Sequence, residues 1–195
     1  MVSSKWNDSI RLTWMDRLLE KTVLQVLPAR LTPNHLTVLR ILLTPPVVIL
    51  LAMDRYEMGI ALFLFAGATD AIDGALARTR KQITEWGILF DPIADKLLIG
   101  SVLFLVVLRN INYALGIALL IVETILIIGG WIRKSRGIIE PANIWGKLKM
   151  GAEVLGVLLL LLAAASGHKL FIDLSNGTLV AALITAIISI FAKML

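Results

Sequence analysis

The chain has 195 residues, of which 58% are hydrophobic and 17% charged, and its mean hydropathy is +0.86. Soluble domains contain about 45–50% apolar and about 25% charged residues, so the composition indicates an integral membrane protein and excludes a soluble enzyme, a disordered regulator and a disulfide scaffold. The absence of cysteine excludes disulfides, thiolate nucleophiles and cysteine-based metal sites, and a net charge of +5 in so apolar a chain indicates residues at the cytoplasmic membrane surface rather than nucleic-acid binding.

Residues 1–30 are predicted to form an interfacial amphipathic helix. Apolar side chains recur at every fourth position and charged residues lie between them, which is typical of a helix that lies in the membrane surface: Trp6, Ile10, Trp14 and Leu18. The alternative is a helix packed against the rest of the protein. Pro28 and Pro33 should separate this helix from the first membrane span.

Six apolar segments have the length of about 20 residues that a hydrocarbon core requires. Backbone groups in lipid must form hydrogen bonds within their own segment, so each segment is predicted to be a transmembrane helix. The connections between the segments are short, and we therefore expect one all-α, six-helix domain over residues 31–195. The predicted spans are residues 34–53, 58–78, 86–108, 112–132, 145–165 and 175–193.

Basic residues are distributed unevenly among the connections and indicate the topology. The connections 79–85 and 133–143 are rich in Lys and Arg, as is the N-terminal region, whereas the opposite side carries few basic residues. The positive-inside rule places these connections and both termini in the cytoplasm. The expected protein is a multi-pass protein of the plasma membrane or of an organellar membrane.

Four aspartates lie within or at the cytoplasmic ends of two predicted spans. Asp70 and Asp73 are three residues apart on one helix, and Asp91 and Asp95 are four residues apart on the next, so each pair occupies one helical face. An ionised carboxylate at membrane depth costs at least ~2.5 kcal/mol, and four together repel one another unless cations or protons neutralise them. Hard oxygen ligands of this kind suit Mg²⁺ or Mn²⁺.

The residues beside these aspartates fit a phosphate-containing substrate. Gly74 and Ala77 keep the helix surface small, and Arg78 carries a guanidinium group suited to a bidentate phosphate contact. Small residues, including Gly87 on the facing helix, equally favour close packing between helices.

The segment from Asp70 to Asp95 reads Asp-x-x-Asp-Gly-x-x-Ala-Arg, eight residues, then Gly-x-x-x-Asp-x-x-x-Asp. This pattern resembles the signature of the CDP-alcohol phosphatidyltransferases at all eight defining positions. The resemblance implies that the phosphatidyl group of CDP-diacylglycerol is transferred to an alcohol with release of CMP, and that the enzyme is dependent on two divalent cations. The family is often homodimeric, so a homodimer is expected by resemblance.

The resemblance also implies roles for individual residues. Asp70, Asp73 and Asp91 would bind the two cations, and Asp95 would be the general base and also contact the second cation. The opening of the first span, Pro33 to Arg40, resembles the segment that covers the nucleotide in this family, although a proline helix start with a polar cap explains it equally well. The residues implied to bind the CDP moiety are Gly74, Ala77, Arg78, Thr84, Pro33, Asn34 and Thr37.

The acceptor alcohol is less sharply indicated. The run Gly-Lys-x-Lys that contains Lys147 and Lys149 resembles the branch of the family that uses glycerol 3-phosphate, and these lysines, with Arg133, are candidates to bind the acceptor phosphate. Basic residues that only set the topology are the alternative. The segment Ala66–Asp70 also resembles cardiolipin synthases of the same superfamily, whose acceptor is phosphatidylglycerol. Glycerol 3-phosphate is the expected acceptor, and phosphatidylglycerol and inositol phosphate are the alternatives.

Two further functions compete with the enzyme. Intramembrane carboxylates also line cation transporters, but the four aspartates cluster toward one side, whereas a transport path continues across the membrane. A non-catalytic protein that binds a CDP-linked lipid is the other alternative, and the intact motif argues against it.

Overall fold

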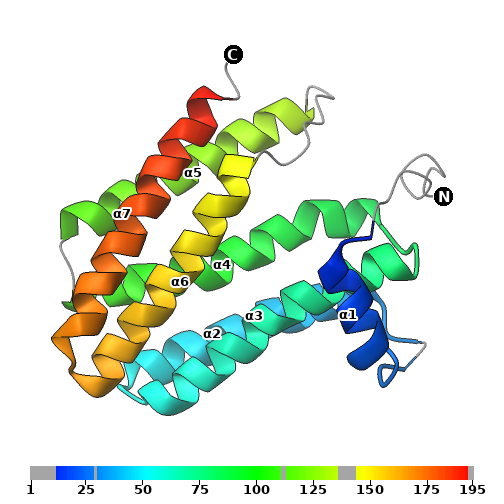
Figure 1. Cartoon of the computed structure of the whole chain (residues 1–195), viewed down its shortest axis with the longest axis horizontal. Helices are drawn as coiled ribbons and strands as arrows, with labels where there is room; N and C mark the ends of the chain where they lie inside the picture. Colours follow the sequence, from blue (N-terminus) through cyan, green and yellow to red (C-terminus); the bar gives the residue numbers. More distant parts are fainter. Residues whose placement is uncertain (1–11, 29, 111–112, 136–143, 193–195) are drawn as a thin grey trace. The chain divides into compact units, whose positions relative to one another are not determined.

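The computed structural model describes residues 12–28, 30–110, 113–135 and 144–192 of the chain (Figure 1). These residues form helices and no strand, as the sequence predicted. The chain divides into two compact units, Met1–Ser101 and Val102–Leu195. The helices are α1 (Trp14–Thr22), α2 (Pro33–Ala52), α3 (Tyr56–Thr79), α4 (Glu85–Asn110), α5 (Tyr113–Ser135), α6 (Ile144–Ser166) and α7 (Lys169–Phe191).

Several of these helices have the length and composition of membrane spans. Among the described residues, α2, α3, α6 and α7 are long and apolar enough to cross a membrane, and α5 contains the shorter apolar stretch Ala114–Gly130. Many large apolar side chains on these helices are exposed, as expected of surfaces that contact lipid. The structure therefore supports a multi-pass membrane protein, and the number of six spans stays a prediction.

The boundary of the last predicted span differs from the structure. We expected this span to begin at residue 175, but α7 begins at Lys169, with His168 as its N-cap, and Gly167, which has a positive φ of 69°, follows the end of α6 at Ser166. Asn176 and Gly177 lie inside the helix. A single glycine costs only about 1 kcal/mol in a helix, which the many other bonds of a 23-residue helix outweigh.

Helix α1 lies against α3 and presents two different sides. Thr13 caps the helix: its hydroxyl accepts a hydrogen bond from the Asp16 backbone at 3.2 Å, and the Asp16 carboxylate accepts one from the Thr13 backbone at 2.9 Å. The Asp16 side is buried, with the residue 1% exposed, whereas Trp14 and Leu18 are 74% and 53% exposed. Trp6 and Ile10, which extend the predicted apolar stripe, lie outside the described residues. An exposed apolar side fits the predicted interfacial location, which stays a prediction.

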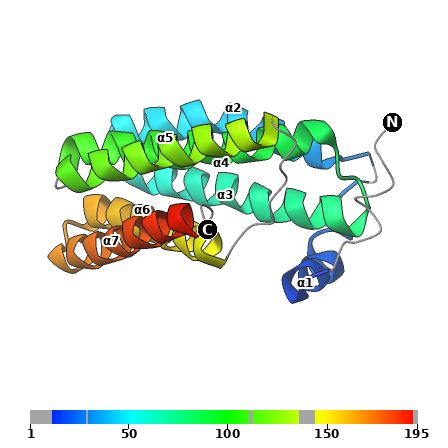
Figure 2. The same cartoon turned by 90° about the horizontal axis from the view of Figure 1, so that it is seen from above.

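The connection between α1 and α2 is tied to the end of α3. The guanidinium group of Arg80 donates hydrogen bonds to four backbone carbonyls of this connection, those of Leu24, Leu27, Pro28 and Leu31, over distances of 3.2–3.5 Å. Leu24 is also buried in a small apolar cluster with Ala75 and Leu76 of α3. These contacts fix the position of α1 within the first unit (Figure 2).

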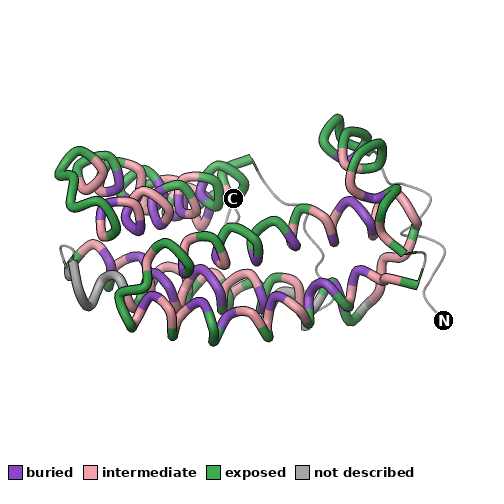
Figure 3. Tube along the Cα trace, turned by 90° about the horizontal axis from the view of Figure 1, so that it is seen from below, coloured by how far each residue is buried: buried purple, intermediate pink, exposed green. Residues whose placement is uncertain are grey.

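Helices α2 and α3 form an antiparallel pair within the first unit. The pair is joined by a tight turn in which Asp54 adopts a positive φ of 59°. Buried and exposed residues alternate along both helices, as Figure 3 shows. The buried faces carry polar side chains as well as apolar ones: Thr37, Arg40 and Thr44 of α2, and Thr69 and Asp73 of α3. Polar side chains therefore lie in the interface between two helices that have the length and composition of membrane spans.

The second unit contains a closely packed helix pair. Helices α6 and α7 lie side by side over much of their length, and α5 contacts α7. Gly156 of α6 permits the close approach, because a Cβ at this position would lie 2.6 Å from the Leu179 side chain of α7.

Candidate active site

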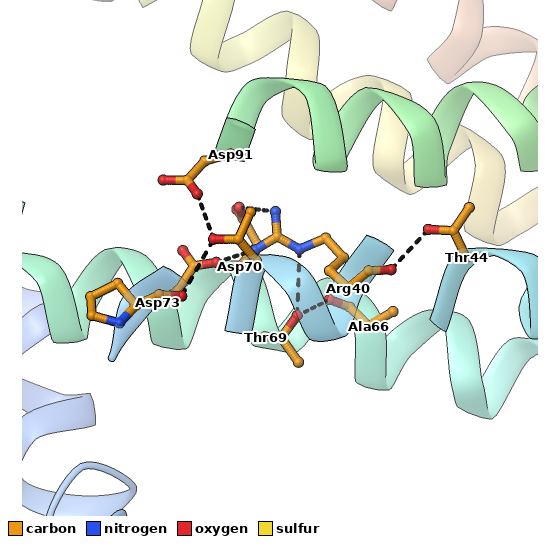
Figure 4. A network of polar contacts seen from close by, with 9 residues as sticks. Arg40, Thr44, Ala66, Thr69, Asp70, Asp73 and Asp91 are labelled. Carbon is orange, nitrogen blue, oxygen red and sulfur yellow. Dashed lines mark hydrogen bonds and ion pairs between the residues drawn. The ribbon is translucent and has the colours of Figure 1, made fainter. Parts of the chain in front are cut away.

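A fully buried arginine organises the acidic residues of α3. Arg40 of α2 is 0% exposed, and its Nη1 lies 2.7 Å from Oδ1 of Asp70. Its Nη2 donates to Oδ2 of Asp73, which is itself only 3% exposed, and its Nε donates to Oγ1 of Thr69 at 3.4 Å. Figure 4 shows dashed lines from the guanidinium group of Arg40 to both aspartates. One side chain thus holds both α3 carboxylates in place.

The third aspartate approaches the same cluster from α4. The hydroxyl of Thr37 on α2 donates a hydrogen bond of 2.6 Å to Oδ1 of Asp91. Asp91 lies near enough to Asp73 to repel its carboxylate, as does Asp70. Asp95 is half-buried one turn further along α4. The structure therefore places Asp70, Asp73 and Asp91 near one another around Arg40, a residue outside the segment from Asp70 to Asp95, and their role as metal ligands stays a prediction.

A second polar group surrounds the start of α4. The Thr84 hydroxyl donates to Oδ1 of Asn34 at 2.8 Å and accepts a hydrogen bond from the Gly87 backbone at 2.9 Å. A Cβ at Gly87 would lie 3.1 Å from Thr84 Oγ1, 3.3 Å from Asn34 Oδ1 and 3.4 Å from Asp91 Oδ2. A side chain at this position would therefore be in tight contact with three polar groups. Two of the residues implied to bind nucleotide, Asn34 and Thr84, contact one another beside a predicted metal ligand.

The motif arginine makes a contact that the sequence did not predict. Nε and Nη2 of Arg78 donate to the two carboxylate oxygens of Asp16 in α1, at 3.0 and 2.8 Å. This hydrogen bonding lowers the pKa of the Asp16 carboxyl to about 2, with smaller contributions from Thr13. The guanidinium group lies over Gly74, because a Cβ there would be 3.2 and 3.3 Å from its two terminal nitrogens. Ala77, the neighbouring motif residue, is half-buried.

The low pKa of Asp16 predicts how the docking of α1 depends on pH. A carboxyl group whose pKa is lowered on folding stabilises the folded state above its unfolded pKa of about 3.9, and this stabilisation is lost as the pH falls toward 2. We expect α1 to stay docked at neutral pH and to loosen between pH 4 and pH 2. A spin label at Glu20→Cys, in a chain without other cysteines, should gain mobility in that window. An Asp16→Asn variant with the same pH response would contradict this assignment.

The charges of the cluster fit a divalent cation. Asp70, Asp73 and Asp91 supply three carboxyl groups and Arg40 a single guanidinium group, so the carboxyl groups outnumber the cationic groups by two. Carboxylate oxygens are hard ligands that suit Mg²⁺ or Mn²⁺. Within the described ranges, no three acidic or histidine side chains converge as tightly as a preformed metal site, because Asp70 and Asp73 face Arg40. Metal binding therefore stays a prediction.

The predicted acceptor residues lie on helices of the second unit. Lys147 of α6 is exposed. Lys149 is buried, and its ammonium group forms ion pairs with Glu153 at 2.8 Å and with Glu123 of α5. Arg133 lies near the end of α5, and its side chain is outside the described residues. Two carboxylates already neutralise Lys149, so Lys147 has the more available charge.

Sequence reasoning named Arg40 only as the end of the segment that resembles the nucleotide cover, without its carboxylate partners, and it did not single out Asp16. Arg40 lies in an apolar helix that contains no acidic residue, which indicates a carboxylate partner on another helix. Asp16 stands three residues after Thr13, a spacing typical of a helix cap. That spacing predicts the capping role of the Asp16 carboxylate, but it gives no sign of the ion pair with Arg78.

Comparison with known proteins adds independent information. Residues 30–191 match the family model of the CDP-alcohol phosphatidyltransferases. The chain is 28% identical to a CDP-diacylglycerol–glycerol-3-phosphate 3-phosphatidyltransferase of Rickettsia typhi, over 73% of this chain and 82% of the relative. It is 34% identical to the enzyme of the same name from Pseudomonas fluorescens, over 66% of this chain and 71% of the relative. It is also 41% identical to a probable cardiolipin synthase of Drosophila melanogaster, over only 35% of this chain and 22% of the relative.

Proposed function

The chain belongs to the CDP-alcohol phosphatidyltransferase family, and on this premise we propose that it transfers the phosphatidyl group of CDP-diacylglycerol to glycerol 3-phosphate, with release of CMP. The observation that carries the proposal is the cluster of three carboxyl groups, those of Asp70, Asp73 and Asp91, around the single buried guanidinium group of Arg40. Similarity to enzymes named for this reaction covers about two thirds or more of the chain.

We assign the metal ligands to the motif aspartates. Asp70, Asp73 and Asp91 would hold two divalent cations, Mg²⁺ or Mn²⁺, with Asp95 at the edge of the site. When bound, such cations neutralise the diphosphate and improve CMP as a leaving group. Arg40 holds the α3 carboxylates side by side before any cation arrives, which reduces their mutual repulsion.

Asp95 is proposed as the general base. It removes the proton from the acceptor hydroxyl as the hydroxyl oxygen attacks the β-phosphorus. A new oxygen–phosphorus bond forms to the acceptor, and the bond from this phosphorus to the oxygen of CMP breaks. The proton remains on the Asp95 carboxyl until it is released to water, and CMP leaves with the electron pair of the broken bond.

The CDP moiety is proposed to lie along the polar groups at the ends of α2, α3 and α4. Asn34 and Thr84 form a hydrogen-bonded pair there, and Thr37 links the same region to Asp91. Arg78, above Gly74, offers a guanidinium group to the diphosphate. Pro33 and Ala77 would supply the small apolar surface between these groups.

The phosphate of the acceptor is proposed to bind basic side chains of α5 and α6. Lys147 and Arg133 rank first, and Lys149 ranks below them because Glu123 and Glu153 already neutralise it. The local similarity to a cardiolipin synthase keeps phosphatidylglycerol as the second candidate acceptor. Phosphatidylglycerol has no free phosphate monoester, so it has less need of these cations.

We also propose the topology and assembly of the enzyme. Six spans, with both termini and the active site on the cytoplasmic side, agree with the distribution of basic residues. Helix α1 lies in the membrane surface with Trp14 and Leu18 toward lipid. The homodimer expected by resemblance is part of this proposal.

The test is an assay of the purified full-length protein in detergent with labelled CDP-diacylglycerol. We expect CMP release only when glycerol 3-phosphate and Mg²⁺ or Mn²⁺ are both present, and phosphatidylglycerophosphate as the lipid product. Serine, inositol phosphate and phosphatidylglycerol are supplied separately as competing acceptors. A cardiolipin product would overturn the assignment of glycerol 3-phosphate as the acceptor. Cation flux into liposomes without CMP release would overturn the assignment of the protein as an enzyme.

A further inference from the structure

We propose that Asp16 of α1 is a positioning residue for the donor substrate, because it fixes the guanidinium group of Arg78 over Gly74 in the orientation that receives the diphosphate of the CDP-linked lipid. This inference deepens the proposed function and rests on it. It adds a residue outside the motif, more than fifty positions before Arg78 in the sequence.

The Asp16 carboxylate is buried and held in place by hydrogen bonds. The residue is 1% exposed although its helix has only nine residues and an exposed opposite side. Thr13 fixes one of its oxygens through a backbone hydrogen bond of 2.9 Å. Arg80 fixes the chain that follows α1 through four backbone carbonyls. The carboxylate therefore reaches Arg78 from a held position.

The geometry of the pair leaves part of Arg78 for a ligand. Asp16 takes hydrogen bonds from Nε and Nη2, which form one edge of the planar guanidinium group. Within the described part of the chain, Nη1 donates no hydrogen bond, and the Arg78 side chain is 39% exposed. A bidentate carboxylate fixes the plane of the group, so the remaining donors point in one direction before the ligand arrives.

Gly74 explains why this orientation matters. The terminal nitrogens of Arg78 lie where a side chain at residue 74 would begin, so the guanidinium group covers the bare backbone of the motif glycine. Asp73, the residue before Gly74, belongs to the proposed metal site. A diphosphate bound at the proposed metal site would therefore lie next to the guanidinium group of Arg78, whose orientation Asp16 has already fixed.

The ion pair between Asp16 and Arg78 links binding of the donor lipid to the packing of α1 against α3. Loss of the Asp16 carboxylate leaves Arg78 as a long, partly exposed side chain with many rotamers, and ordering it then opposes binding of the donor. The proton transfer assigned to Asp95 is unaffected. The variant should therefore change the apparent affinity for CDP-diacylglycerol far more than the turnover number.

The experiment compares the purified full-length protein with Asp16→Asn and Asp16→Glu. We expect Asp16→Asn to raise the KM for CDP-diacylglycerol about 10-fold or more, as hydrogen bonds to charged groups do when lost, with kcat and the KM for glycerol 3-phosphate nearly unchanged. Asp16→Glu should recover part of the loss. Glu20→Gln, which removes an exposed carboxylate from the same helix, is the matched control and should behave as the wild type.

A double-mutant cycle distinguishes positioning from a general structural role. If Asp16 acts through Arg78, Asp16→Asn will add nothing in an Arg78→Ala background. Arg80→Gln loosens the connection after α1 without removing the carboxylate, and should raise KM less than Asp16→Asn does. Additive effects of Asp16→Asn and Arg78→Ala, or a fall in kcat with KM unchanged, would overturn the proposal.

Calorimetric titration with CDP-diacylglycerol and Mg²⁺ separates this inference from the proposed function. If the wild type binds the lipid but releases no CMP with any acceptor, the proposed function fails, and an unchanged Kd in Asp16→Asn would overturn the positioning role as well. A weaker Kd in that variant would support it. A wild type that does not bind the lipid would overturn both.

Discussion

Replacing Asp95 with asparagine is expected to lower kcat by about 10²–10⁴-fold, the usual contribution of a general base. Asparagine has nearly the shape of aspartate but cannot accept the proton of the acceptor hydroxyl. Because Asp70, Asp73 and Asp91 remain, binding of Mn²⁺ should be largely retained. The measurements are CMP release for turnover and electron paramagnetic resonance for Mn²⁺ binding.

The matched control for Asp95→Asn is Glu57→Gln. This variant removes an exposed carboxylate from the first turn of α3, at the other end of that helix from Asp70 and Asp73. This variant should retain full activity and unchanged Mn²⁺ binding. Full turnover in Asp95→Asn would remove Asp95 as the base. Loss of Mn²⁺ binding together with turnover would reassign Asp95 to the metal ligands.

Replacing Arg40 with glutamine is expected to lower the free energy of unfolding by about 3–5 kcal/mol, the usual cost of removing one partner from a buried ion pair. The side chain is fully buried, and its loss leaves the Asp70 and Asp73 carboxylates without their shared cation. SDS-induced unfolding in detergent micelles measures the change. Arg55→Gln, an exposed arginine before α3, is the control and should change stability little.

Two additions make the Arg40 result specific. Asp73→Asn in the Arg40→Gln background should restore part of the lost stability, because it removes a buried charge that has lost its partner. Mn²⁺ should protect Arg40→Gln from unfolding more than it protects the wild type, because the cation then replaces the missing positive charge. Equal protection of both proteins would show that Arg40 and the cation do not share these carboxylates.

The acidic cluster could be predicted because its information is local. Asp70 and Asp73 occupy one face of a helix, Asp91 follows after a short connection, and an ionised carboxylate at membrane depth requires a counter-charge. The helical fold followed from apolar length alone. Neither inference required knowledge of which helices pack together.

Arg40 and Asp16 could not be placed because their partners are distant in the sequence. The carboxylate partners of Arg40, Asp70 and Asp73, lie about thirty positions later in the sequence. The partner of Asp16, Arg78, lies 62 positions later. Helical periodicity shows which face a residue occupies, and it does not show which other helix meets that face. Lys149 differs from these two residues, because one of its partners, Glu153, lies only four positions later on the same helix, whereas Glu123 lies on α5. Its contact with the acceptor phosphate stays a prediction.

The buried pairing of α2 with α3 has a consequence for the biogenesis of the protein. An arginine near the middle of a lone helix costs about 2.5–3.5 kcal/mol during insertion by the translocon, and each aspartate in the following helix carries a similar penalty. Arg40 with Asp70 and Asp73 cancels much of this cost only when both segments are present. The ribosome completes α3 soon after α2, because only Met53–Arg55 separate them. The two segments should therefore leave the translocon together as a helical hairpin.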